Sequence, residues 1–177
     1  GLMFLALYVV LRRVNKSFMA IASSFVFLGV AVFFATNTAF NMLSLSNKYA
    51  IAATDVQRTN LLAAGEAMLA INRFSSPDAH PGAGGYVSLL LVGVAGIITS
   101  VVMLNSGVFN RATAYVGIMA NSLDLAYCIA FVFVSTIDSE TLAVIFLPAA
   151  GLLLMIWHIM VGWKLFRLEK YTPPNPN

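Results

Sequence analysis

Residues 17–47 read SFMAIASSFVFLGVAVFFATNTAFNMLSLSN and contain no formally charged side chain. Residues 79–110 and 141–163 are equally free of Asp, Glu, Lys and Arg, and residues 112–137 are broken only by Asp124. Each run exceeds the roughly 20 residues that a helix needs to cross about 30 Å of hydrocarbon. The chain is therefore expected to fold as an all-α, polytopic transmembrane helix bundle.

The composition also favours a membrane protein. Hydrophobic residues make up 60% of the 177 residues and charged residues 10%, whereas about a quarter of a soluble domain is charged. Cys128 is the only cysteine, which excludes an intramolecular disulfide and a CxxC metal or redox site. The connections between the apolar runs are too short for a second core, so residues 1–177 are expected to form a single integral-membrane domain.

Four complete transmembrane helices are predicted, over residues 17–45, 84–104, 112–137 and 141–163. Ser17 is the expected N-cap of the first of them. Residues 1–11 are apolar, but as a helix they would extend only about 16 Å before Arg12 and Arg13, half of a bilayer. They are interpreted as a partial helix, the end of a truncated N-terminal membrane segment.

Residues 55–72 show a different pattern. Thr54 and Gln57 have the spacing of a capping box, and Asp55 would lie favourably at the positive end of a helix. Polar residues recur at helical intervals on one face, and apolar residues occupy another. Because charged residues are costly in hydrocarbon, an interfacial amphipathic helix on the outer face is predicted here instead of a crossing.

Lysine and arginine are distributed unequally between the two faces that these crossings define. Seven of the ten lie on one face: Arg12, Arg13, Lys16, Arg111, Lys164, Arg167 and Lys170. The other three, on the opposite face, are Lys48, Arg58 and Arg73. Because basic residues are enriched on the cytoplasmic side, the first face and the tail over residues 165–177 are predicted to be cytoplasmic, in a plasma membrane. The net charge of +3 thus indicates topology and not nucleic-acid binding.

Asp124 is the leading candidate for a functional residue. A carboxyl group near the middle of a crossing must be protonated, paired or hydrated, and such groups often mark proton, ion or ligand sites. Asn121 and Cys128 lie about one turn before and after it. The carboxyl group is expected to point into the bundle and to be hydrogen-bonded by Asn, Tyr or water. Asp124→Leu should then destabilise the protein, and Asp124→Asn should not. The alternative is a polar group that only joins two helices.

Three further polar residues complete the predicted site. Asn37 and Asn41 are one helical turn apart toward the outer end of the first crossing, at a depth from which they could reach Cys128. A role in helix packing is favoured for both, and a solvated position is favoured for Glu66. Gly93 and Gly96 are expected to permit close helix approach. The candidate intramembrane polar site comprises Asp124, Asn121, Cys128, Asn37, Asn41 and Glu66.

No catalytic or metal site is predicted. His80 and His158 lie at different depths, and no HExxH motif is present. Ser75 and Ser76 lack the GxSxG context of a nucleophile elbow. No cofactor is expected, and the sequence does not favour enzymatic activity.

Three segments carry a resemblance to a known family: LYVVLRRVNKS (residues 7–17), YAIAATD (residues 49–55) and LLAAGE (residues 61–66). They are similar to small multi-pass membrane proteins of bacteria and archaea, domain-of-unknown-function family four-three-eight-six. The similarity extends over most of the chain, to residues 157–168. It implies a prokaryotic helix bundle with one complete helix upstream of Gly1, and it supplies no catalytic residues.

Three classes of function remain open. The leading one is a non-catalytic structural, accessory or ligand-sensing bundle that contacts membrane lipids and assembles as a homo-oligomer or as a subunit of a larger membrane complex. The second is a small transporter or proton-coupled carrier centred on Asp124. The third is an intramembrane enzyme that uses Glu66, Asp124 and a histidine, which would have to converge from different depths. Co-purification from native membranes would support the first class, and density for an ion or lipid-like molecule beside Asp124 would favour the second or the third.

Overall fold

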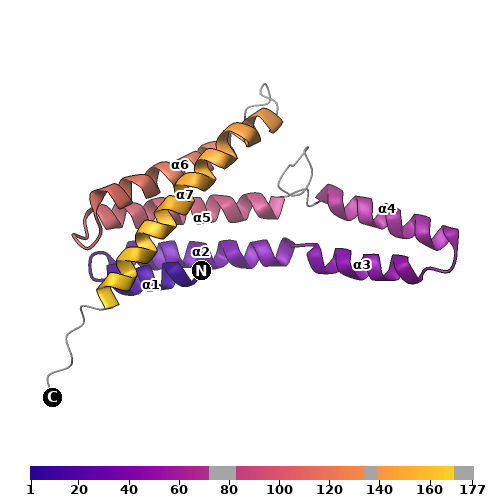
Figure 1. Cartoon of the computed structure of the whole chain (residues 1–177), viewed down its shortest axis with the longest axis horizontal. Helices are drawn as coiled ribbons and strands as arrows, with labels where there is room; N and C mark the ends of the chain where they lie inside the picture. The colour runs from indigo at the N-terminus through magenta and orange to yellow at the C-terminus, as the bar shows by residue number, and fades with distance from the viewer. Residues whose placement is uncertain (72–82, 134–138, 170–177) are drawn as a thin grey trace, which may run out of the picture.

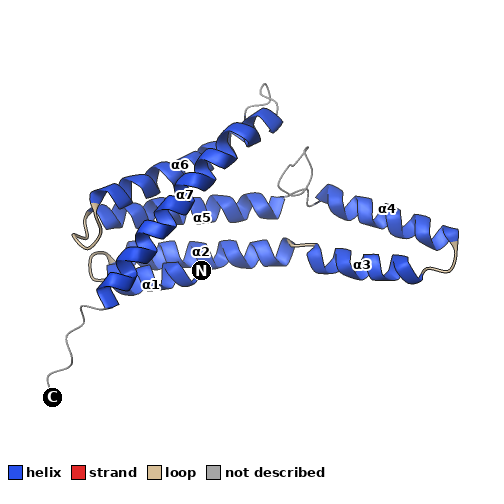
Figure 2. Ribbon diagram, viewed as in Figure 1, coloured by secondary structure: helices blue, strands red, loops and turns tan. Residues whose placement is uncertain are grey.

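The computed structural model describes residues 1–71, 83–133 and 139–169, and these ranges are helical apart from short connections (Figures 1 and 2). In chain order the helices are α1 (Leu2–Leu11), α2 (Lys16–Thr36), α3 (Ala39–Ile51), α4 (Asp55–Ile71), α5 (Ala83–Leu104), α6 (Arg111–Phe133) and α7 (Ser139–Glu169). No strand occurs within the described ranges, so the predicted all-α class is confirmed. The predicted loop over residues 75–82 and the end of the crossing predicted to reach residue 137 lie outside them.

Four long helices form the bundle. α2 packs against α5, α5 against α6 and α6 against α7, while the shorter α1 packs against α2 and α5. Their buried apolar side chains meet in one core, whose largest members include Leu7, Leu11, Met19, Met103 and Trp157. α7 has 31 residues, about 46 Å, and runs obliquely to the other helices (Figure 1). It continues through residues 165–169, which were predicted to belong to the tail.

Three helical segments are long and apolar enough to cross a membrane: Lys16–Ile51, Gly84–Leu104 and Phe146–Leu168. Their length and composition suggest a membrane protein. The described part of the predicted crossing over residues 112–137 belongs to α6, which is not among these three. Asn121 and Asp124 near the middle of α6 reduce its apolar character. The fourth complete crossing therefore stays a prediction.

The first predicted crossing, residues 17–45, is broken in the structure. α2 ends at Thr36, and Asn37 adopts an extended backbone with φ −72° and ψ 121°. Asn37 Oδ1 accepts a hydrogen bond from the Ala39 N–H at 2.8 Å, and α3 begins there. Asparagine favours such local bonds to the backbone over continuation of a helix, so the prediction of one uninterrupted helix is wrong. With 21 residues, about 31 Å, α2 alone matches the hydrocarbon thickness.

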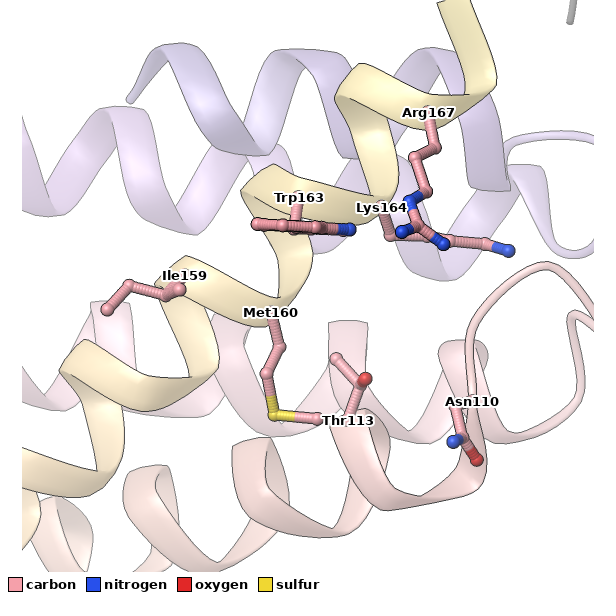
Figure 3. Close-up of a pocket in the computed structure, with 7 residues that line it drawn as sticks. All are labelled: Asn110, Thr113, Ile159, Met160, Trp163, Lys164 and Arg167. Atoms are coloured by element: carbon pink, nitrogen blue, oxygen red, sulfur yellow. The ribbon is translucent and has the colours of Figure 1, made fainter.

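The α1–α2 turn, the α5–α6 loop and the end of α7 lie at the same end of the bundle, which we call the basic end (Figure 1). Asn15 in the turn accepts a hydrogen bond from the Phe18 N–H at 3.0 Å, so Asn15 caps α2 in place of the predicted Ser17. On the other side of this end, Asn110 of the loop faces the last turns of α7 (Figure 3). The basic end carries Arg12, Arg13, Lys16, Arg111, Lys164 and Arg167.

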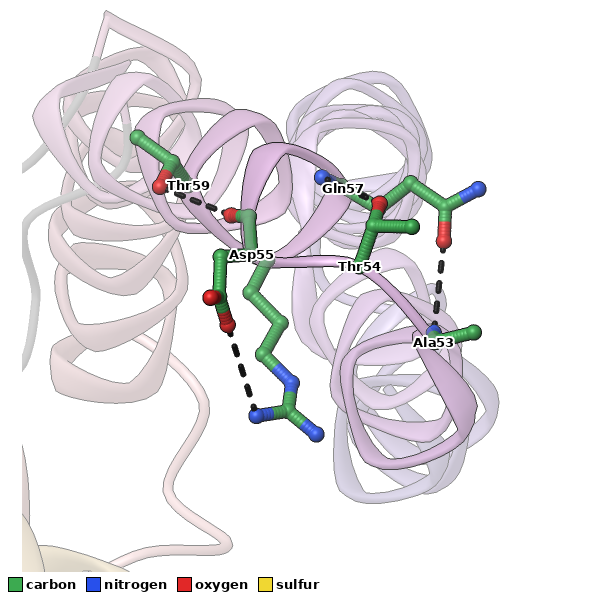
Figure 4. A network of polar contacts seen from close by, with 6 residues as sticks. Ala53, Thr54, Asp55, Gln57 and Thr59 are labelled. Atoms are coloured by element: carbon green, nitrogen blue, oxygen red, sulfur yellow. Dashed lines mark hydrogen bonds and ion pairs between the residues drawn. The ribbon is translucent and has the colours of Figure 1, made fainter.

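α3 and α4 form an antiparallel hairpin that extends from the opposite end of the bundle (Figure 1). α4 confirms a helix over the predicted stretch. Thr54 Oγ1 accepts a hydrogen bond from the Gln57 N–H at 3.3 Å, and Gln57 Oε1 accepts one from the Ala53 N–H at 3.3 Å (Figure 4). The capping residue is therefore Thr54, as predicted, although the return bond reaches Ala53. The location of α4 on the outer interface stays a prediction.

Candidate functional site

Three of the predicted site residues lie close together on α6. Asn121 and Cys128 are buried, each 2% exposed, and Asp124 between them is half-buried. Asn121 Nδ2 donates a hydrogen bond to Gly117 O on the same helix at 2.7 Å, so it does not bind the carboxylate. No hydrogen bond or ion pair among the described residues involves the Asp124 carboxylate. Asn121 is therefore not the partner of the carboxylate, because a backbone carbonyl takes up its amide, and the predicted hydrogen bond from Asn, Tyr or water stays a prediction.

Asn121 instead packs into a space that a glycine leaves on the neighbouring helix. Its side chain occupies the position that a Cβ of Gly96 on α5 would take. One turn away the arrangement is reversed, because Ser100 of α5 and Trp157 of α7 occupy the position that a Cβ of Gly117 on α6 would take. We call these five residues the polar seam: Gly96, Ser100, Gly117, Asn121 and Trp157.

The register of the polar seam follows from helical geometry. Gly96 and Ser100 are four residues apart on α5, and Gly117 and Asn121 are four residues apart on α6, so each pair lies on one face of its helix. Each helix therefore presents one glycine and one polar side chain to the other. Small residues at such contacts let two backbones approach closely, as predicted for Gly96.

The polar atoms of the seam are shielded from solvent. Ser100 is 0% exposed and Trp157 is 1% exposed. Within the described part of the chain, neither Ser100 Oγ nor Trp157 Nε1 has a hydrogen-bond partner. A hydroxyl and an indole N–H are hydrogen-bonding groups but neither is a strong acid or base near neutral pH. The seam is therefore suited to helix packing and to binding a small polar group, and less suited to proton transfer.

Cys128 belongs to a second, smaller apolar cluster, about two turns from Asn121 along α6. It is a free thiol, buried together with Tyr127 and packed against Leu89 and Phe146. A buried cysteine in apolar surroundings behaves as a small hydrophobic residue and is unreactive. Cys128 therefore contributes packing at this end of α6.

The other three predicted site residues lie at or beyond the hairpin end of the bundle. Asn37 forms the break before α3, and Asn41 is exposed on α3. Glu66, exposed on α4, lines a pocket of about 260 Å³ between α3 and α4 together with Tyr49 and Leu61. The structure therefore groups Asn121, Asp124 and Cys128 on α6, and it does not bring Asn37, Asn41 or Glu66 to them (Figure 1).

The histidine of α7 lies beside the polar seam, with its ring centroid 5.2 Å from that of Trp157. His158 is exposed, and its Nδ1 lies 2.7 Å from Leu154 O of the same helix. Over residues 1–71, 83–133 and 139–169, no three His, Cys, Asp or Glu side chains are close enough to hold a metal ion. Glu66 and Asp124, which the third class of function requires together, lie on α4 and α6.

Comparison with known proteins places the chain in a family. A family model described as Domain of unknown function (DUF4386) matches residues 2–162, which include every residue of the polar seam. The comparisons with curated proteins and with solved structures found no match. Because the family model covers far more than half of the chain, the protein belongs to the DUF4386 family of domains of unknown function.

Proposed function

We propose that the protein is a multi-pass membrane protein of a prokaryotic plasma membrane and acts as a non-catalytic structural, accessory or ligand-sensing bundle. The polar seam is the observation that carries the proposal, because its buried polar residues are used to pack helices together. Large apolar side chains point outward along α7, among them Leu152, Ile159 and Phe166. Contact with lipid or with another membrane subunit requires such a surface.

The proposed topology has four complete crossings, α2, α5, α6 and α7, preceded by the partial helix α1. The placement of the basic end supports a cytoplasmic C-terminus, because the turn, the loop and the end of α7 that carry the excess of cations all lie there. The hairpin of α3 and α4 would then lie on the outer side.

Cysteine labelling tests this topology. In a Cys128→Ala background, Asn15→Cys and Ser106→Cys should react with a membrane-impermeant maleimide only after the inner face is opened, because both positions lie at the basic end. Asn60→Cys on α4 should react in intact cells. Labelling of Asn15 and Ser106 from different sides, or of all three positions from outside, would exclude the proposed crossings. Labelling of Asn15 and Ser106 from outside with Asn60 protected would reverse the orientation.

The hairpin supports an accessory role in a larger assembly. α3 has no buried residue, and Phe40 and Ile51 on it are each 82% exposed. Exposed apolar patches of this kind mark contacts with a membrane or another protein. The mass of the particle extracted from native membranes in mild detergent tests the role. A mass equal to one chain in a detergent micelle would contradict it.

A carrier centred on Asp124 is the second candidate, because the carboxylate is half-buried and has no bonded partner among the described residues. Intramembrane carboxyl groups mark proton relays in pumps and transporters. No other observation favours the carrier over the bundle role.

Asp124 variants distinguish the two candidates. Asp124→Leu should fold and should gain about 1 kcal/mol of stability in detergent, because the change removes a costly polar group and leaves no described residue unpaired. This reverses the sequence-based expectation, which assumed bonded partners. Asp124→Asn, the isosteric control, should match the wild type.

Proton flux into liposomes with an internal pH dye is the functional readout. Equal flux for the wild type and Asp124→Asn is expected for a bundle without transport activity. Faster flux for the wild type would overturn the leading proposal in favour of the carrier.

A further inference from the structure

A groove of about 420 Å³ lies at the basic end, between the start of α6 and the last turns of α7. Asn110 and Thr113 line it on the α6 side. Five residues line it on the α7 side: Ile159, Met160, Trp163, Lys164 and Arg167 (Figure 3). We call this feature the basic groove. It is separate from the polar seam and from Asp124, and none of the functions above uses it.

The basic groove has a cationic half and an apolar half. Lys164 and Arg167 lie toward the end of α7, and Ile159 lies toward the middle of the helix (Figure 3). Arg167 follows Ile159 by eight residues, about 12 Å along the helix axis. A headgroup layer is about 6 Å thick, so this length covers both the headgroup region and the first part of the hydrocarbon.

The cations of the groove are positioned to bind an anion. Arg167 Cζ lies 5.3 Å from the centroid of the Trp163 ring, and this cation–π contact holds the guanidinium group beside the groove. Among the described side chains, neither Lys164 nor Arg167 forms an ion pair. On the opposite wall, Asn110 Oδ1 accepts from the Ala112 N–H at 3.3 Å, which leaves its amide nitrogen as a donor.

The apolar half determines which kind of anion fits. Ile159 and Trp163 are 60% and 63% exposed, so the apolar half of the groove is open to its surroundings. A free phosphate ion would contact only the cations and would leave the apolar half uncovered. A phospholipid places its phosphate and its acyl chains in the same order as the two halves of the groove.

We propose that the basic groove binds an anionic phospholipid, with its phosphate on Lys164 and Arg167 and its acyl chains along Ile159, Met160 and Trp163. The proposal rests on the membrane placement of α7 proposed above. The neighbouring cations Arg12, Arg13 and Arg111 at the same end attract anionic lipid to this surface in general. The groove adds a defined position for one molecule.

Native mass spectrometry of the detergent-solubilised protein, titrated with phosphatidylglycerol or phosphatidylcholine, measures the binding. Phosphatidylglycerol should bind the wild type with saturation at one tight site. The double variant Lys164→Gln, Arg167→Gln should bind it about 30-fold more weakly, as expected for two cations near a membrane surface. The matched control is Arg12→Gln, Arg13→Gln, which removes the same charge from the same end outside the groove. Its affinity should fall by less than about threefold.

Each contrary outcome is informative. Equal loss in the two double variants, or equal binding of phosphatidylcholine, would overturn the groove as a specific site. Glycerol phosphate that competes as well as the lipid would assign the groove to soluble anions and overturn the lipid proposal. Thermal unfolding without added lipid shows whether the variants are folded. If they are not, Ile159→Gln serves as a second test, since it should weaken lipid binding and leave every cation in place.

The cysteine labelling described above tests the membrane placement of α7 independently. A wrong membrane placement is therefore distinguishable from a failure of lipid binding.

Discussion

Gly117→Ala is expected to cost about 3 kcal/mol of stability or more, the upper range for overpacking a buried contact. The new Cβ would collide with Ser100 Oγ and with the Trp157 indole, whose Cδ1 would lie only 2.8 Å away. These two side chains come from α5, which also packs on α2, and from α7, where the Trp157 ring also contacts Phe4 of α1. A rigid indole cannot move aside as the end of a flexible side chain can, so the helices must separate.

Gly96→Ala should show the same effect with a smaller magnitude, about 2 kcal/mol. The Cβ would collide with the Asn121 side chain, which could rotate away only by giving up its 2.7 Å hydrogen bond to Gly117 O. The loss of that bond contributes about 1 kcal/mol. The polar seam thus predicts that substitutions at two glycines on different helices damage the same contact.

Two other glycines provide matched controls. At Gly151 and Gly162 of α7, no described atom other than those of the adjacent residues and the helix's own backbone lies within 4 Å of the position that a Cβ would take. Alanine there should be neutral or should stabilise the helix by up to about 1 kcal/mol, because glycine is a poor helix former. Thermal unfolding in mild detergent, followed by circular dichroism, compares all four variants. Equal behaviour of Gly117→Ala and Gly151→Ala would show that the α5–α6–α7 contact is not as close as described.

The helical class and its long apolar helices could be predicted because they depend on local composition. Uncharged runs of sufficient length indicate a membrane helix whatever surrounds them. The predicted crossing over residues 84–104 has the same limits as the apolar helical segment Gly84–Leu104. Thr54 could be predicted as a cap for the same reason, since the capping box is a local pattern. The basic residues could be assigned to one membrane face by counting the crossings that precede each of them, because short connections leave few alternative topologies.

The break at Asn37 was missed although its signal is local. Thr36, Asn37 and Thr38 are all residues that cap helices or turns, but Asn37 lies within an apolar run and was interpreted as a polar group between helices. Once α2 ends at the thickness of the hydrocarbon, α3 continues beyond it and pairs with α4. This pairing removes Asn41 and Glu66 from the neighbourhood of Asp124.

The polar seam could be predicted only in part. Gly96 signals close approach, but sequence does not show which helix approaches or in which register. Ser100 lies in an apolar run, and Trp157 resembles any aromatic residue of a membrane helix, so neither gives a local signal of its role. The orientation of Asp124 depends on the rotation of α6, which the packing of Asn121 on Gly96 determines.

Trp157→Ala is expected to have the largest effect of any single truncation, a loss of about 3–5 kcal/mol. Trp157 is the largest fully buried side chain among the described residues, and it joins three parts of the bundle. Its ring lies over Gly117 of α6, and its centroid is 6.2 Å from that of Phe4 of α1 at a tilt of 55°. Removing the ring leaves a cavity that these helices cannot close without shifting, and it removes the aromatic contact that joins α1 to α7.

Trp157→Phe separates packing from hydrogen bonding at the same position. Since Trp157 Nε1 has no hydrogen-bond partner within the described residues, phenylalanine should keep much of the packing and should cost less than about 2 kcal/mol. Trp163→Ala is the control for loss of an indole, because that ring is mostly exposed and its removal should change stability little. Unfolding of the three variants in the same detergent provides the comparison. A loss with phenylalanine as large as with alanine would show that the indole N–H is bonded in the folded protein, and the polar seam would then be a site that holds a polar group as well as a packing contact.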